Sequence, residues 1–199
     1  MSTTPVMPVT PDTPVRAFIE VVDTVAYLVE AVEEEQWSAP TPCTDWNVQQ
    51  LVDHLVTGQR TFAEVMGAQS TLPELDADPA PQALKGTFRM SAATLVAAFE
   101  RPGALERTVQ APIGEVPGAV ALRLQTIEHL VHGWDLAQAI GQKALFGDSA
   151  VEREIEFTRG LVAQLPSGPG APFAPSRTAS EDAPAIDRLA ALLGRHLTR

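Results

Sequence analysis

Hydrophobic residues recur every three or four positions along much of the chain, the spacing that places them on one face of an α-helix. Between about residues 15 and 35 this pattern is carried by Phe18, Val21, Val22, Val25 and Leu28. The same periodicity predicts helices at about 48–66, 83–101, 119–141 and 148–164, and a last helix over AIDRLAALLG. The expected fold class is therefore all-α, a helical bundle with additional C-terminal helices.

Local signals sharpen some of these boundaries. Asn47 followed by Gln50 has the form of a capping box, so the second helix should begin near Val48. Gly141 is a natural C-cap for the fourth helix. The stretch ALERTVQAPIGEVPGAVA is rich in proline and glycine. It predicts a short hairpin or an extended crossover, but not the core of a sheet.

Composition and charge argue against several classes of protein. The 199 residues suit one domain, which we expect over 15–199 after a flexible lead-in at 1–14. A net charge of -11 without a basic patch argues against nucleic-acid binding and against anionic membranes. No apolar run could span a bilayer, and the N-terminus does not resemble a secretory signal. The single Cys43 excludes an internal disulfide, so a cytoplasmic protein is expected.

The stretch QTIEHLVHGWDLAQAIG carries two histidines and a glutamate within five positions of a predicted helix. Glu128 and His132 are four residues apart and project together, about 40° around the helix axis, with Asp135 continuing the stripe. His129 points about 100° away from Glu128. The pattern is therefore not the HExxH zinc motif, in which both histidines are ligands. One carboxylate and one imidazole are too few ligands for an ion.

The second predicted helix offers a third donor. His54 lies on the shoulder of its apolar stripe, aligned with Gly58 and Thr61. If the two helices are antiparallel neighbours, His54, Glu128 and His132 could form a His2Glu set with an open position, the pattern of catalytic zinc. Nickel or iron would also accept these ligands. The alternative is an ordinary solvated Glu/His pair on a helix surface.

Two stretches, PTPCTDWNVQQLVDHLVTG and RLQTIEHLVHGWDLAQAIG, resemble the DinB-like metalloenzyme superfamily. The resemblance is closer to the actinobacterial branch that contains the metal-binding N-terminal domain of mycothiol-dependent maleylpyruvate isomerase. The family pattern is a Pro-Cys-x-x-Trp entry, a helix bearing histidine, and then E-x-x-x-H-x-x-D-L. It is matched here by Cys43, Trp46, His54, Glu128, His132, Asp135 and Leu136.

This resemblance implies a DinB-like four-helix bundle that holds one divalent ion, usually zinc, with His54, Glu128 and His132 as ligands. It also implies a low-molecular-weight thiol, mycothiol, as cosubstrate. A divalent ion with an open position would stabilise a thiolate at neutral pH, which could then attack an electrophile. We expect Asp135 to orient a ligand or substrate group, and Gly58 and Thr61 to line the pocket.

The function expected from the sequence is thus a metal-dependent thiol transferase or isomerase. Its partners would be a small-molecule thiol and an electrophilic substrate, with the protein a monomer or homodimer. Two other hypotheses remain open at this point. The chain could be a non-catalytic module that binds a metal or thiol, or a metal-free bundle that serves association.

Overall fold

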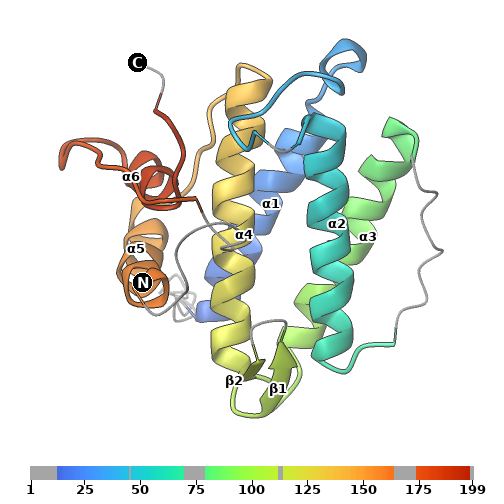
Figure 1. The fold of residues 1–199 in the computed structure, drawn as a ribbon. Coiled ribbons are helices and arrows are strands. Elements are labelled where there is room, and N and C mark those ends of the chain that lie inside the picture. The colour runs from blue at the N-terminus through green and yellow to red at the C-terminus, as the bar shows by residue number, and fades with distance from the viewer. Residues whose placement is uncertain (1–12, 45, 70–78, 112–113, 164–173, 198–199) are drawn as a thin grey trace, which may run out of the picture.

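The computed structural model describes residues 13–44, 46–69, 79–111, 114–163 and 174–197; of the expected lead-in, residues 1–12 lie outside them. Within these residues a bundle of long helices forms the body of the molecule (Figure 1). Its helices are α1 (Pro14–Glu30), α2 (Val48–Val65), α3 (Pro81–Phe99) and α4 (Gly118–Ala139). The remaining elements are η1 (Glu34–Gln36), β1 (Thr108–Ala111), β2 (Gly114–Pro117), α5 (Asp148–Val162) and α6 (Ala185–Leu192). The predicted all-α bundle is confirmed.

The bundle helices run in two directions. The hydrogen bond from Gln36 Nε2 to the carbonyl of Ile140 (3.3 Å) joins the chain just after α1 to the end of α4. The bond from Arg101 Nη1 to the carbonyl of Gly67 (2.9 Å) joins the chain just after α2 and α3. Helices α1 and α4 therefore point one way, and α2 and α3 the other (Figure 1). As a result α2 and α4 are antiparallel neighbours, as the ligand hypothesis requires.

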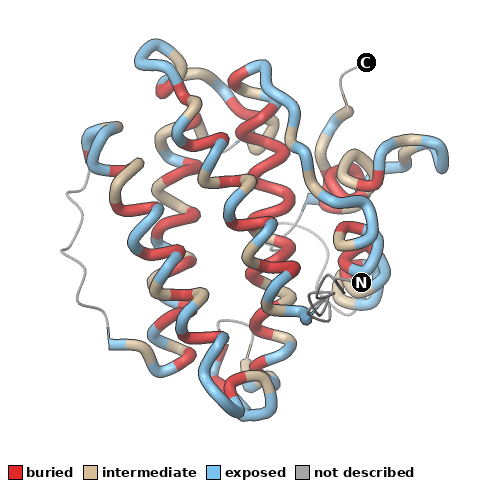
Figure 2. Tube along the Cα trace, turned by 180° about the vertical axis from the view of Figure 1, so that it is seen from behind, coloured by how far each residue is buried: buried red, intermediate tan, exposed pale blue. Residues whose placement is uncertain are grey.

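Helix α4 lies at the centre of the molecule and is buried on more than one side. One face joins the bundle core, whose largest fully buried side chains include Phe18, Phe88, Phe99, Leu51 and Leu95. Another face packs against α5 and α6 through Ile127, Leu130, Val151 and Leu189. Buried positions run along the helices of the bundle and along those packed beside them (Figure 2). Because α4 is buried on more than one side, its apolar residues are spread around the helix axis rather than gathered in one stripe. No helix in the described ranges is long and apolar enough to span a membrane.

The element ends agree with most of the sequence signals. Asn47 and Gln50 form the predicted capping box, and α2 begins at Val48. Gly141 has φ +67°, and the amide of Gln142 donates to the carbonyl of Ala137 (2.9 Å), a Schellman motif that ends α4. Of the two alternatives for the proline-rich stretch, the structure has the hairpin, in which β1 and β2 pair antiparallel.

The first helix is shorter than its hydrophobic pattern predicts. It ends at Glu30 rather than near residue 35, and η1 follows. Lys85 Nζ donates to the carbonyls of Glu30 (2.9 Å) and Val32 (2.8 Å), so these groups bond to a side chain of α3. A tertiary contact, which periodicity cannot reveal, therefore sets this end.

Candidate metal centre

The three predicted ligands meet where α2 crosses α4. Glu128 Oε2 lies 3.3 Å from His54 Nε2 and 3.3 Å from His132 Nε2. One donor atom from each of these side chains lies within 4.8 Å of the other two. One turn of α2 lies beside one turn of α4 at this point. The site therefore joins His54 to Glu128, which is 74 positions later in the chain.

The neighbouring sequence holds the His54 ring in place. The capping box at the start of α2 fixes the helix so that Leu51 and Leu55 enter the core and His54 lies beside them, half-buried. The indole of Trp46 stacks on the imidazole of His54, with ring centroids 4.2 Å apart and planes inclined by 27°. The Trp of the Pro-Cys-x-x-Trp entry therefore covers one face of the His54 ring.

Asp135 contacts the ring nitrogen of His132 that does not face the other two donors. Its Nδ1 lies 3.1 Å from Asp135 Oδ2, so the ring donates Nδ1–H to the carboxylate. In the neutral ring Nε2 then carries the lone pair and faces Glu128 and His54, whereas a second proton on Nε2 makes the ring a cation that donates to Glu128. A buried carboxylate behind a histidine is a common way to fix the ring and tautomer of a metal ligand. The orienting role of Asp135 stays a prediction, and this contact is the geometry that it needs.

The charges of this cluster are coupled. Burial alone would raise the pKa of Glu128, but hydrogen bonds from His132 and His54 outweigh it and hold that pKa well below its usual range. Burial alone would lower the pKa of His132, but its contacts with Asp135 and Glu128 raise it overall. Glu128 is therefore an anion at neutral pH, and a cation that displaced the protons between these groups would meet a negative carboxylate.

The donor set fits a divalent transition metal. Two imidazole nitrogens and one carboxylate oxygen are the ligands of many catalytic zinc sites. The described residues also contain a second group of potential donors, Cys43, His132 and Asp135. Both oxygens of Asp135 already accept hydrogen bonds from the buried guanidinium of Arg195, and one also accepts from His132. The first group is therefore better suited to an ion.

A cavity of about 380 Å³ opens beside the three donors. The entry segment and the three donors form one side of it, through Pro42, Cys43, Thr44, Trp46, His54, Glu128, Val131 and His132. The C-terminal segment forms the other side, through Ala174, Arg177, Gly194, Arg195 and His196. An open space next to a half-exposed donor cluster is where a substrate would reach an ion.

Gly58 and Thr61 are not among the residues that line this cavity, so their predicted place in the pocket was wrong. Gly58 faces α4 lower in the bundle, where a Cβ atom would lie 4.0 Å from Gln125 Nε2. Thr61 is exposed. Later residues of α2 lie against earlier residues of α4 because the helices are antiparallel, so each turn after His54 moves away from the site.

Sequence reasoning missed the C-terminal wall of the cavity. Arg177, Arg195 and His196 lie between 45 and 64 positions after His132, the end of the E-x-x-x-H motif, and belong to no recognisable ligand pattern. Gly194 was the available signal, because a glycine after a helix predicts a turn of the chain. It could not indicate what the residues after that turn would contact.

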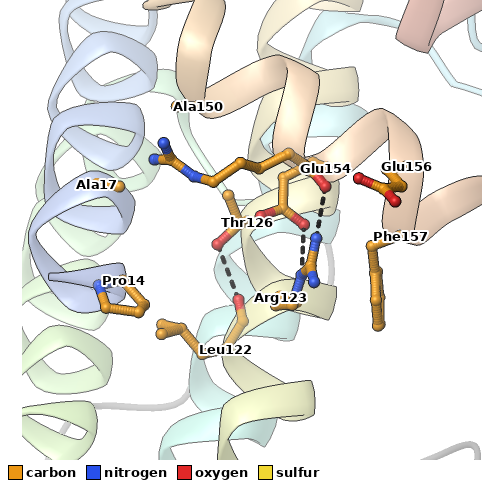
Figure 3. Close-up of a pocket in the computed structure, with 10 residues that line it drawn as sticks. Pro14, Ala17, Leu122, Arg123, Thr126, Ala150, Glu154, Glu156 and Phe157 are labelled. Atoms are coloured by element: carbon orange, nitrogen blue, oxygen red, sulfur yellow. Dashed lines mark hydrogen bonds and ion pairs between the residues drawn. The ribbon is translucent and has the colours of Figure 1, made fainter. Parts of the chain in front are cut away.

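A larger cavity, about 590 Å³, lies between α1, α4 and α5 (Figure 3). Two of its charged groups are paired: Arg123 Nε lies 3.0 Å from Glu154 Oε2, and the Arg123 guanidinium also lies over the ring of Phe157. Neither of the two donor groups found among the described residues lies there. Chemistry, rather than size, therefore identifies the smaller cavity as the candidate site.

Residues 18–137 match the family described as the mycothiol maleylpyruvate isomerase N-terminal domain. The chain belongs to this family. The matched range contains His54, Glu128, His132 and Asp135, so the whole donor cluster lies inside the family domain. The C-terminal wall of the cavity lies outside it.

Two relatives match nearly the whole chain, and two solved structures share its fold. An uncharacterised protein of Mycobacterium tuberculosis strain ATCC 25618 / H37Rv is 37% identical over 183 residues, 92% of this chain and 97% of the relative. Its counterpart in strain CDC 1551 / Oshkosh matches equally. The crystal structure of the mycothiol-dependent maleylpyruvate isomerase aligns with a TM-score of 0.60 at 18% identity, over 76% of this chain and 70% of that chain. A histidine mutant of that enzyme aligns with the same TM-score at 17% identity. The fold is thus a DinB-like helical bundle.

Proposed function

We propose that this protein is a metal-dependent enzyme that joins a low-molecular-weight thiol, mycothiol, to an electrophilic substrate, as a thiol transferase or a thiol-dependent isomerase. The observation that carries the proposal is the convergence of His54, Glu128 and His132 on the wall of an open cavity. Membership of a family named for a mycothiol-dependent enzyme supports the choice of thiol.

His54, Glu128 and His132 would hold one divalent ion, most naturally Zn²⁺, with Ni²⁺ or Fe²⁺ as alternatives. Such an ion would supply an open coordination position that favours the thiolate form of a thiol at neutral pH. The chain's own residues supply orientation. Asp135 keeps the Nε2 lone pair of His132 directed at the site, and Trp46 fixes the His54 ring.

The opposite wall suits an electrophile that carries a negative charge. Arg177 donates from Nε to the carbonyl of Gly194 (2.9 Å), and its two Nη atoms make no hydrogen bond to the described residues. His196 is exposed on the same wall. A guanidinium with two unused donors is well shaped to bind a carboxylate.

The first test is metal content. Purified protein should contain about one equivalent of divalent metal per chain, and His54→Gln, Glu128→Gln and His132→Gln should each lose it. Elemental analysis of gel-filtered protein is the measurement. His196→Gln is the matched control, because His196 lines the cavity but lies outside the donor cluster. Stoichiometric metal in the His54→Gln protein would refute a site shared by α2 and α4.

The second test is thiol chemistry. Mycothiol added to the cobalt-substituted protein should produce a sulfur-to-metal charge-transfer band, and a bare monothiol should produce it only at higher concentration. A panel of electrophiles is then assayed for mycothiol-dependent turnover. A charge-transfer band without turnover of any electrophile would favour a non-catalytic binding module, and a cobalt spectrum that no thiol changes would refute the thiol role.

The third test concerns the charged wall. Arg177→Met should raise KM for a carboxylate-bearing electrophile by roughly tenfold or more, as expected for the loss of a charged hydrogen bond. The same variant should leave the thiol-induced cobalt band unchanged. An equal KM in both proteins would show that Arg177 does not contact the substrate.

A further inference from the structure

Arg195 reaches the donor cluster from the far end of the chain. Its Nη2 lies 2.9 Å from Asp135 Oδ2, and its Nε lies 3.3 Å from each of the two oxygens of the same carboxylate. The Asp135 side chain is fully buried and that of Arg195 is nearly so. The pair joins residues 60 positions apart.

The end of α6 determines where Arg195 lies. The amide of Arg195 donates to the carbonyl of Ala190 (2.9 Å) across Gly194, which has φ +89°, so a Schellman motif turns the chain back toward α4. A Cβ atom on Gly194 would lie 2.6 Å from the Cβ of Ala174, so only glycine fits there. Helix α6 is anchored on α4 by the buried Leu189 and by a bond from Trp134 Nε1 to Asp187 Oδ1 (2.8 Å).

Asp135 accepts hydrogen bonds from both Arg195 and His132, and the two contacts have different effects. Arg195 occupies both oxygens and balances the buried negative charge, while Oδ2 also accepts the Nδ1–H of His132. A guanidinium held against both oxygens fixes the plane of the carboxylate, and that plane fixes the His132 ring. Without Arg195 the carboxylate would be a buried anion whose oxygens are free to rotate away from His132.

We propose that Arg195 is a positioning residue of the metal site: through Asp135 it holds the His132 ring and its Nδ1–H tautomer, so the C-terminal segment sets the affinity for the ion. This inference rests on the proposed function, because it assumes that His132 is a ligand. It assigns a role to a residue outside the family domain.

The competing explanation is that Arg195 only fastens α6 to α4. Asp187→Ala is the matched control, since it removes another α4–α6 bond without touching Asp135. Zinc affinity is measured by competition with a chromophoric chelator, and melting temperature is measured with chelator present. Arg195→Met should weaken zinc binding by about 10- to 100-fold, the usual effect of losing a partner behind a ligand. Arg195→Lys keeps the charge but not the planar guanidinium, so its zinc affinity should lie between those of wild type and Arg195→Met.

Asp187→Ala should lower the melting temperature but bind zinc as wild type does. If Arg195→Met binds zinc as tightly as wild type, Arg195 only attaches α6 to α4 and the proposal is wrong. Loss of affinity in Asp187→Ala equal to that in Arg195→Met would also overturn it, because any loosening of α6 would then suffice.

A readout without metal keeps this test separate from the proposed function. Nitrogen-15 NMR of metal-free protein, at a pH where the imidazole is neutral, reports which ring nitrogen of His132 carries the proton. Wild type should show the Nδ1–H tautomer, and Arg195→Lys should show a mixture. A single Nδ1–H tautomer in both proteins would overturn the inference. Stoichiometric metal in His54→Gln would instead overturn the proposed function.

Discussion

Gln59 and His129 are hydrogen-bonded inside the core, and His129 lies on a different face of α4 from Glu128. Gln59 Nε2 lies 3.0 Å from His129 Nε2, and His129 Nδ1 lies 2.7 Å from the carbonyl of Gln125. Ser91 Oγ donates to the Gln59 amide oxygen, which leaves the amide nitrogen to donate to the ring. Both nitrogens of His129 are therefore used in the core, and this histidine has none left for an ion.

His129→Ala should destabilise the protein without emptying the metal site. The substitution leaves a cavity against Phe18 and removes the acceptor of a buried amide, which together should cost roughly 2–4 kcal/mol of unfolding free energy. Urea denaturation measures the loss, and elemental analysis should still find about one metal per chain. A metal-free but folded His129→Ala protein would contradict this assignment.

The same histidine should make stability depend on pH. Burial lowers the pKa of His129 to about 4, from about 6.5 in an unfolded chain. Between these values the unfolded state binds a proton that the folded state does not, so stability should fall as pH drops from 6.5 to 4. The slope from this group should reach about 1.4 kcal/mol per pH unit. Glutamine cannot titrate, so the difference in unfolding free energy between wild type and His129→Gln, both with chelator, isolates the effect. Parallel pH profiles for the two proteins would contradict it.

Gly133 in the middle of α4 should not tolerate alanine. A Cβ atom there would lie 2.7 Å from Phe146 Cζ and 2.8 Å from Val25 Cγ2. The Phe146 ring is only half-buried and can shift, but Val25 is fully buried. Overpacking of about 1–3 kcal/mol should exceed the gain of up to about 1 kcal/mol from better helix propensity.

Gly86 in α3 is the matched control for Gly133. A Cβ atom there would meet nothing within 4 Å, so Gly86→Ala should stabilise the protein by about 0.5–1 kcal/mol. Thermal or urea unfolding of both variants gives the comparison. If both substitutions changed the unfolding free energy in the same direction, the close packing around Gly133 would not be the cause of its effect.

Asn47→Ala should loosen the start of α2, the helix that carries His54. The Asn47 side chain accepts from the amide of Gln50 (2.9 Å), and its loss should cost about 1 kcal/mol. Asn47→Asp keeps an acceptor oxygen at the N-cap and should remain close to wild type. Unfolding free energies of the two variants test the cap, and equal losses in both would argue against it.

The sequence by itself determined the elements and the identity of three candidate ligands. Helix ends at Val48 and near Gly141 followed from caps, whose partners lie within a few residues. The pairing of Glu128 with His132 also followed, since four positions are about one turn of a helix. These are local relationships, set by backbone geometry, and a single stretch of sequence contains all the information they need.

Tertiary structure decided whether His54 would meet that pair, what holds the ligand side chains and what surrounds them. The antiparallel contact of α2 with α4 placed His54 at the site and carried Gly58 and Thr61 away from it. The Schellman turn after α6 delivered Arg195 to Asp135, 60 positions away. Such contacts depend on the packing of whole helices, where a shift of one turn changes every partner. For that reason the pattern of residues along the chain does not specify them.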